Sequence, residues 1–169
     1  DHWMFEFILN PFISVVEFGL ELVESVFTWL PWFVPAIIVF ALVARTRRCG
    51  LATFTAFAVI YPGVVGVWSQ SIVTISLMAV AVFICVLIGV PLGVLAALRP
   101  RVEVALRPIL DGMQTVPATV YLIPIVLLFG IGPAPAAIAT VIYALPPMVR
   151  LTTLGIQQVP KSAVEAAQM

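Results

Sequence analysis

The residues able to do chemistry are few in this sequence, and their spacing matches no catalytic site. The single histidine is His2, so neither the HExxH zinc motif nor a Ser–His pair within an apolar stretch is present. The phosphate-binding motif GxxxxGK[ST] is also absent. Cys49 follows a basic segment and Cys85 lies deep in an apolar one, so we expect both to pack without pairing. The sequence therefore predicts no catalytic residue, no metal site and no cofactor held by this chain.

Asp111 is the one carboxylate whose neighbours indicate a role. Asp111 and Gln114 have the spacing of a helix capping box, and Arg107 precedes Asp111 by four residues, where an ion pair can form. We interpret Asp111 as the cap of a helix that starts near residue 112. A gate or a proton site is the alternative, and it is less favoured because Asp111 lies at the edge of an apolar stretch and not within it.

Composition identifies the environment that must position these residues. Hydrophobic residues make up 63% of the 169 residues, charged residues make up 9%, and the mean hydropathy is +1.19. A soluble domain is closer to about half apolar and about a quarter charged, so this composition favours a membrane protein. Eight basic and eight acidic residues cancel to a net charge of zero, which argues against a nucleic-acid-binding protein.

The positions of the charges predict the number of membrane crossings. No charged residue occurs in three long stretches, 25–44, 49–98 and 112–149. One helical crossing needs about 20 apolar residues, so these stretches have room for one, two and two crossings. Turns at 68–71 and 130–135 divide the two longer stretches. We therefore predict five transmembrane helices, near residues 29–44, 51–68, 71–98, 112–129 and 135–149.

The charges also predict an orientation. Five crossings place every Lys and Arg on one side of the membrane, and the positive-inside rule assigns that side to the cytoplasm. The N-terminal segment 1–28 then lies outside. Its polar residues recur at helical spacing: Asn10, Ser14, Glu17, Glu21, Glu24 and Thr28. We interpret 1–28 as an amphipathic helix on the outer surface, separate from a transmembrane domain at 29–169, with its acidic stripe either solvated or docking a partner.

Proline and glycine inside the predicted helices mark bends and close contacts. Proline cannot donate the backbone hydrogen bond that continues a helix, and glycine lets two helices approach closely. The positions at which we expect a bend or a close contact are Pro62, Gly89, Pro91, Gly93, Pro117, Pro124 and Pro146.

Several segments of the chain resemble a known family. They are WSQ at 68–70, IGVPLG at 88–93, RPILDGMQTVPATVYLIPIVLLFGIGPAP at 107–135 and ALPPMVRLTTLGIQQVPKSAVEAAQ at 144–168. From residue 68 onward the sequence thus resembles the permease subunit of the glycine betaine/proline ABC importers, in the type I ABC permease superfamily. Glu165, Ala166 and Ala167 match the opening of the EAA loop of that superfamily.

The resemblance implies a fold, partners and a location. The fold is an all-α polytopic helical bundle, and the chain holds part of it because it stops before the rest of the EAA motif and the later helices. Two permease subunits, which we expect to be copies of one chain, form the pathway through the cytoplasmic (inner) membrane. A separate ATPase subunit uses ATP and Mg²⁺, and a substrate-binding protein delivers the solute from outside. The segment 161–169, above all Glu165, Ala166 and Ala167, would couple the permease to the ATPase.

The function that the resemblance implies is import of glycine betaine or proline-type osmoprotectants, with no catalysis by the permease itself. Two alternatives stay open. One is a type I ABC permease for another small solute. The other is a non-transporting membrane scaffold or sensor whose N-terminal helix binds a partner.

Candidates for lining the pathway are polar or amphipathic residues in or near the fourth and fifth predicted helices. They are Gln114, Thr115, Thr119, Tyr121 and Tyr143. The alternative is that a tyrosine marks the membrane interface and a threonine bonds its own helix backbone. An aromatic ring on the pathway would offer a trimethylammonium group a cation–π contact.

Overall fold

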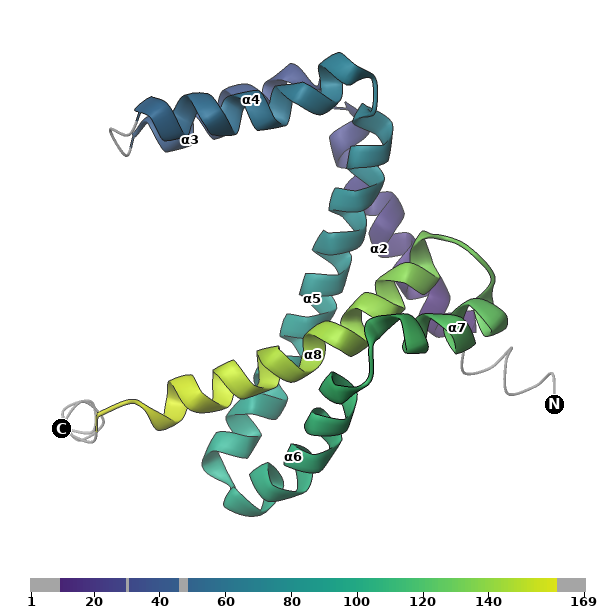
Figure 1. Cartoon of the computed structure of the whole chain (residues 1–169), viewed down its shortest axis with the longest axis vertical. Helices are drawn as coiled ribbons and strands as arrows, with labels where there is room; N and C mark the ends of the chain where they lie inside the picture. Colours follow the sequence, from purple (N-terminus) through teal and green to yellow (C-terminus); the bar gives the residue numbers. More distant parts are fainter. Residues whose placement is uncertain (1–9, 30, 46–48, 161–169) are drawn as a thin grey trace. The chain divides into compact units, whose positions relative to one another are not determined.

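The computed structural model describes residues 10–29, 31–45 and 49–160, and every regular element within them is an α-helix. This confirms the all-α class for the described part of the chain. Residue contacts divide the chain into two compact units, 1–79 and 80–169, with the boundary inside α5. The helices, labelled in Figure 1, are α2 (Asn10–Trp29), α3 (Phe33–Ala44), α4 (Cys49–Val65), α5 (Trp68–Leu98), α6 (Pro100–Thr115), α7 (Ala118–Phe129) and α8 (Pro133–Gln157).

Helix α2 is the described part of the predicted amphipathic segment. Its 20 residues form one continuous helix, as the spacing of the polar residues predicts. Glu17 and Glu21 are exposed, whereas Val16 and Leu20 are buried, so the helix has a polar and an apolar side. The rest of the predicted segment, residues 1–9, lies outside the described residues.

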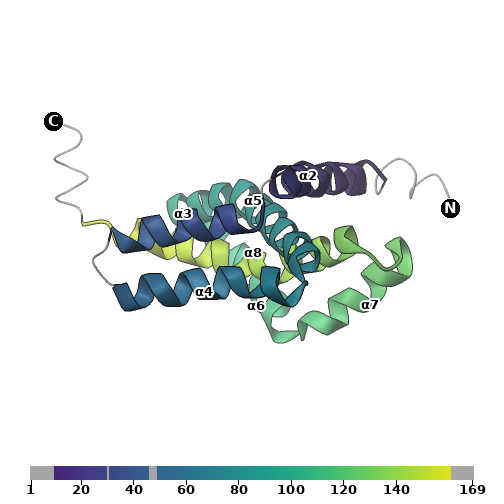
Figure 2. The ribbon, with the colours of Figure 1, turned by 90° about the horizontal axis from the view of Figure 1, so that it is seen from above.

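In the first unit, α3 and α4 pack side by side, as Figures 1 and 2 both show. A Cβ atom at Gly63 would lie 2.7 Å from Cε3 of Trp32, so only glycine lets the indole ring rest on α4. Pro62 lies inside α4 near its end, and its carbonyl accepts a 2.9 Å hydrogen bond from the N–H of Val67. Gly66 has a φ of +83°, which favours glycine, and it makes the turn into α5.

In the second unit, α5 and α8 approach closely at two glycines of α5. A Cβ atom at Gly89 would lie 2.6 Å from Cγ of Met148, and one at Gly93 would lie 2.5 Å from Cβ of Thr152. The missing side chains therefore let the two backbones approach, as in many membrane helix pairs. The core beside this contact consists of Ala81, Cys85 and Val141, with Ile84, Ala144 and Met148 packed against it.

A sharp break separates α6 from α7, at an angle of 87°. Val116 has extended backbone angles (φ −84°, ψ 127°), because the ring of Pro117 disfavours helical geometry in the residue before it. The prediction of one helix over 112–129 was therefore wrong: Pro117 ends a helix and does not merely bend one. The capping role predicted for Asp111 was also wrong, because Asp111 lies inside α6, which starts at Pro100.

Within the described residues, two helices are long and apolar enough to cross a membrane, α5 with 31 residues and α8 with 25. At 1.5 Å per residue they are about 46 and about 38 Å long, against about 30 Å of hydrocarbon. Counting the bent pairs α2–α3 and α6–α7 as one span each raises the number to four. The predicted end of the last span at 149 was wrong, because α8 continues through Pro146 and Pro147 to Gln157. Both prolines are tolerated in a helix that is packed on its neighbours around the buried Pro146 and Val149.

Candidate functional site

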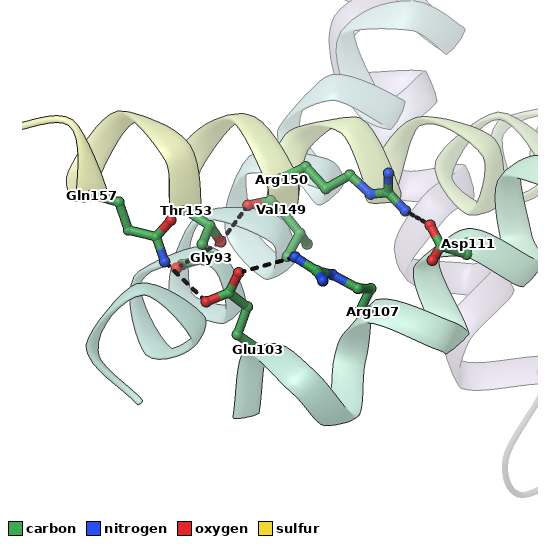
Figure 3. Close-up of polar contacts among 8 residues, drawn as sticks. All are labelled: Gly93, Glu103, Arg107, Asp111, Val149, Arg150, Thr153 and Gln157. Carbon is green, nitrogen blue, oxygen red and sulfur yellow. Dashed lines mark hydrogen bonds and ion pairs between the residues drawn. The ribbon is translucent and has the colours of Figure 1, made fainter. Parts of the chain in front are cut away.

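One polar face of α6 meets one polar face of α8. Glu103 and Asp111 are eight residues apart on α6, and Arg150 and Gln157 are seven apart on α8. Because a helical turn takes 3.6 residues, each pair lies on one face of its helix, about two turns apart. Packing of α6 against α8 brings the two faces together. We call these four residues the polar junction (Figure 3).

Two side-chain contacts hold the polar junction. The guanidinium of Arg150 forms a hydrogen-bonded ion pair with the carboxylate of Asp111, and Nε2 of Gln157 donates a 2.9 Å hydrogen bond to Oε2 of Glu103. The side chains of Asp111 and Arg150 are 52% and 39% exposed, so neither is enclosed by the fold. The partner predicted for Asp111 was wrong, because Arg107 instead pairs with Glu103 of its own helix at 3.7 Å.

A cavity of about 410 Å³ lies beside the polar junction, between α5, α6 and α8. Its charged lining is paired internally, Glu103 with Arg107 and Asp111 with Arg150. Thr153 is buried at its wall, where its hydroxyl lies 3.1 Å from the carbonyl oxygen of Gly93 and 2.8 Å from that of Val149. The remaining lining is apolar and consists of Ala96, Leu106, Leu110, Val149 and Leu154. The cavity therefore presents paired charges, which suits a structural contact better than an ion site.

A second hollow, of about 300 Å³, lies between α7 and α8, and we call it the α7/α8 groove. It brings together two of the predicted pathway residues, Thr119 and Tyr143, and none of its lining residues carries a charge. Tyr143 is 52% exposed, so its ring is accessible. An aromatic face in an uncharged, mostly apolar groove can attract a methylated cation without binding it as tightly as a carboxylate would. The other lining residues are Ala118, Leu122, Ala136, Ala139 and Thr140.

The other predicted pathway residues lie elsewhere. Tyr121 donates from its hydroxyl to the carbonyl of Met113 at 3.0 Å, so it spans the break between α6 and α7. Thr115 bonds its own helix, with its hydroxyl 3.0 Å from the carbonyl of Gly112, and Gln114 is exposed. The structure therefore brings two of the five candidates into one groove and places three around the end of α6.

The predicted coupling residues Glu165, Ala166 and Ala167 lie outside the described residues. The structure describes the helix that precedes them in the chain: α8 ends at Gln157, and residue 160 is the last one described. Among the described residues, no group of three or more His, Cys, Asp and Glu side chains is placed to hold a metal ion. Pro91, Pro124 and Pro146 each lie inside a helix, namely α5, α7 and α8.

Three members of the polar junction escaped prediction from the sequence: Glu103, Arg150 and Gln157. The segment that holds Glu103 lies between the predicted transmembrane helices 71–98 and 112–129, and no helix was predicted there. The four-residue spacing of Glu103, Arg107 and Asp111 was a signal for a helix there. No local pattern could reveal that the partners of this helix lie 39 and 54 residues away.

Comparison with known proteins places the second unit in a family. Residues 89–169 match the family model described as the binding-protein-dependent transport system inner membrane component. The match begins at Gly89, so it includes the contact between α5 and α8, the polar junction and the α7/α8 groove.

Three curated relatives cover more of the chain. It is 50% identical over 134 residues (79% of this chain, 38% of the relative) to the glycine betaine/proline betaine transport system permease protein ProW of Escherichia coli. It is 41% identical over 165 residues (95% and 54%) to the glycine betaine transport system permease protein OpuAB of Bacillus subtilis. It is 37% identical over 164 residues (92% and 58%) to the glycine betaine/carnitine transport permease protein GbuB of Listeria monocytogenes. The chain thus spans between 38% and 58% of the length of these relatives.

Proposed function

Because the chain belongs to the inner membrane components of binding-protein-dependent transport systems, the type I ABC permeases, we propose that it is part of the membrane subunit of an osmolyte importer. The solute class is small quaternary ammonium compounds of the glycine betaine type. The observation that carries the proposal is the 50% identity over 134 residues to a glycine betaine/proline betaine permease. The first alternative, a permease for another small solute, would share the fold and differ in the solute.

The α7/α8 groove supports the proposed solute class. Glycine betaine is a zwitterion whose trimethylammonium group is bulky and weakly hydrated, so an aromatic ring can attract it. Tyr143 and Thr119 line the same groove, and none of its lining residues carries a charge that would hold the solute against release. We infer that this groove is part of the translocation pathway. Gln114, Thr115 and Tyr121 would act around it, at the end of α6.

The partners follow from the family. A separate ATPase subunit would hydrolyse ATP with Mg²⁺ and dock on the segment 161–169, where Glu165, Ala166 and Ala167 resemble the EAA loop. A substrate-binding protein would deliver the solute, and a second copy of the permease would complete the pathway. The permease itself would bind neither nucleotide nor metal.

The proposed orientation places the basic segments in the cytoplasm and the N-terminus outside. Five crossings are formed by α3, α4, α5, the segment 112–129 (the end of α6 with α7) and α8, with 1–28 as a surface helix beside a transmembrane domain at 29–169. The support is that two of these helices are long and apolar enough to span alone, and that the intervening Arg-rich segments would otherwise enter the bilayer. This arrangement also places 161–169 on the ATPase side.

Growth under osmotic stress tests the proposed function in cells. A strain without its own betaine uptake receives the full-length protein with its ATPase and binding protein, in medium of high osmolarity. We expect growth to recover when glycine betaine is added and to fail when the ATPase lacks its phosphate-binding lysine. Recovery without added betaine, or with the inactive ATPase, would contradict the proposal. Recovery only with a solute that has no quaternary ammonium group would favour the first alternative, a permease for another small solute. A non-transporting scaffold or sensor would restore growth neither with glycine betaine nor with such a solute.

A further inference from the structure

Helix α6 is bounded at both ends by residues outside helical geometry. Arg99, before its first residue, has φ −130° and ψ 100°, and Val116, after its last, has φ −84° and ψ 127°. Both are extended conformations, so α6 continues neither α5 nor α7. A 16-residue helix between two such joints is a rigid segment whose position depends on lateral contacts.

The polar junction supplies those contacts at two matched points. From Glu103 to Asp111 is about 12 Å along α6, and from Arg150 to Gln157 is about 10.5 Å along α8, at 1.5 Å per residue. Glu103 contacts Gln157, and Asp111 contacts Arg150, so the two helices run in opposite directions with their polar partners in register. Figure 3 shows the two contacts at opposite ends of the paired segments.

Apolar packing contributes little to the position of α6. Leu110 is the buried residue of this helix, and a cavity of about 410 Å³ separates part of it from α5 and α8. By contrast, α5 and α8 lie so close that a Cβ atom at Gly93 would be 2.9 Å from the carbonyl oxygen of Val149. Helices α5 and α8 therefore form a tight pair, and α6 is joined to it largely through polar side chains.

We propose that the polar junction makes α6 a strut that carries movement of the coupling segment to the pathway. This inference rests on the proposed function, in which 161–169 docks on the ATPase. Helix α8 ends at Gln157, three residues before Pro160, the last described residue. A displacement of 161–169 is therefore transmitted first to α8. Asp111–Arg150 and Glu103–Gln157 pass it to α6. The 3.0 Å hydrogen bond from Tyr121 to the carbonyl of Met113 passes it across the break to α7, which forms one wall of the groove.

The strut is tested by the number of solute molecules moved for each ATP hydrolysed. The full-length transporter, with its ATPase and binding protein in proteoliposomes, is compared with its Asp111→Asn, Arg150→Gln and Arg101→Gln variants. We expect the first two to keep ATP hydrolysis and to lose several-fold in glycine betaine moved per ATP. Arg101→Gln is the matched control, because Arg101 is an exposed arginine of the same helix and is not part of the polar junction. A normal ratio in Asp111→Asn and Arg150→Gln would overturn the inference.

Two further variants restore the contact between residues 111 and 150 in different ways. They distinguish a strut from a folding defect and from a gate that must open. The double variant Asp111→Arg/Arg150→Asp should recover most of the lost ratio. In a background from which Cys49, Cys85 and any other native cysteine of the full-length protein have been removed, a short cleavable cross-link between Asp111→Cys and Arg150→Cys should give coupled transport, and its reduction should uncouple it. Loss of uptake on cross-linking would show that α6 must separate from α8, and it would overturn the strut. If the unmodified transporter moves no solute, the proposed function fails instead.

Discussion

Replacing Gly93 by alanine should destabilise the contact between α5 and α8 by a predictable amount. The added Cβ would lie 2.5 Å from Cβ of Thr152 and 2.9 Å from the carbonyl oxygen of Val149, whereas carbon atoms in contact are about 3.5–4.0 Å apart. The helices must therefore separate by about 1 Å, which as overpacking costs about 1–3 kcal/mol. Weakening the hydrogen bond between Thr153 and the Gly93 carbonyl adds about 0.5–1.5 kcal/mol.

The helix preference of alanine over glycine returns about 0.5–1 kcal/mol, so we expect a net loss of about 1–3 kcal/mol in the free energy of unfolding. The matched control is Gly155→Ala in α8, where an added Cβ would meet no atom within 4 Å. That variant should gain about 0.5–1 kcal/mol. Both are measured on the full-length protein by unfolding in mixed micelles with increasing SDS, followed by circular dichroism. If the two variants agree within about 0.5 kcal/mol, the described contact between α5 and α8 is refuted.

Three further predictions address the groove, the turn and the coupling segment. Tyr143→Leu should slow uptake of glycine betaine several-fold and Tyr143→Phe should retain it, because the ring and not the hydroxyl attracts the cation. Equal initial uptake rates for the two variants would exclude the ring from the pathway. Gly66→Ala should lower the free energy of unfolding by about 1 kcal/mol, since alanine disfavours a φ of +83°, and Gly50→Ala, with open space around it, is its control in the same micelle titration. Glu165→Ala should reduce both co-purification of the ATPase and uptake, and normal values for both would exclude Glu165 from docking.

The sequence predicted the helices that are defined by an uninterrupted apolar stretch. The third predicted span at 71–98 ends where α5 ends, at the last residue of the charge-free stretch. The turn predicted at 68–71 was wrong, because the chain turns at Gly66 and α5 already begins at Trp68. The start of α8 was likewise marked by the glycines and prolines of 130–135. These features act locally, so the order of the residues is enough to reveal them.

The errors concern α6, whose structure depends on distant partners. No helix was predicted for its charged residues, and Asp111 was interpreted as the cap of a helix that starts near residue 112. In the structure those charges face Arg150 and Gln157 across the polar junction, so a polar helix is stabilised by a neighbour that follows it by about 40 residues or more. The effect of Pro117 was also underestimated. A proline can either bend a helix or end it, and which of the two occurs depends on what packs on either side of it.

The residues that line the α7/α8 groove were predicted in part. Tyr143 and Thr119 stood out as polar or aromatic residues in apolar helices, and they line one hollow. Tyr121 stood out for the same reason but contacts the end of α6, because the 87° break turns its side chain toward the carbonyl of Met113. Residue type alone could not separate the two cases, since the direction of each side chain follows from the break.

The most direct test of the central claim is uptake by purified components. The full-length protein, its ATPase and its binding protein are reconstituted in proteoliposomes, and entry of labelled glycine betaine is measured with ATP on the ATPase side. We predict uptake that requires ATP and the binding protein and that is reduced by an excess of unlabelled betaine. Absence of ATP-dependent uptake of glycine betaine, proline betaine, choline and carnitine under conditions where the ATPase is active would contradict the account.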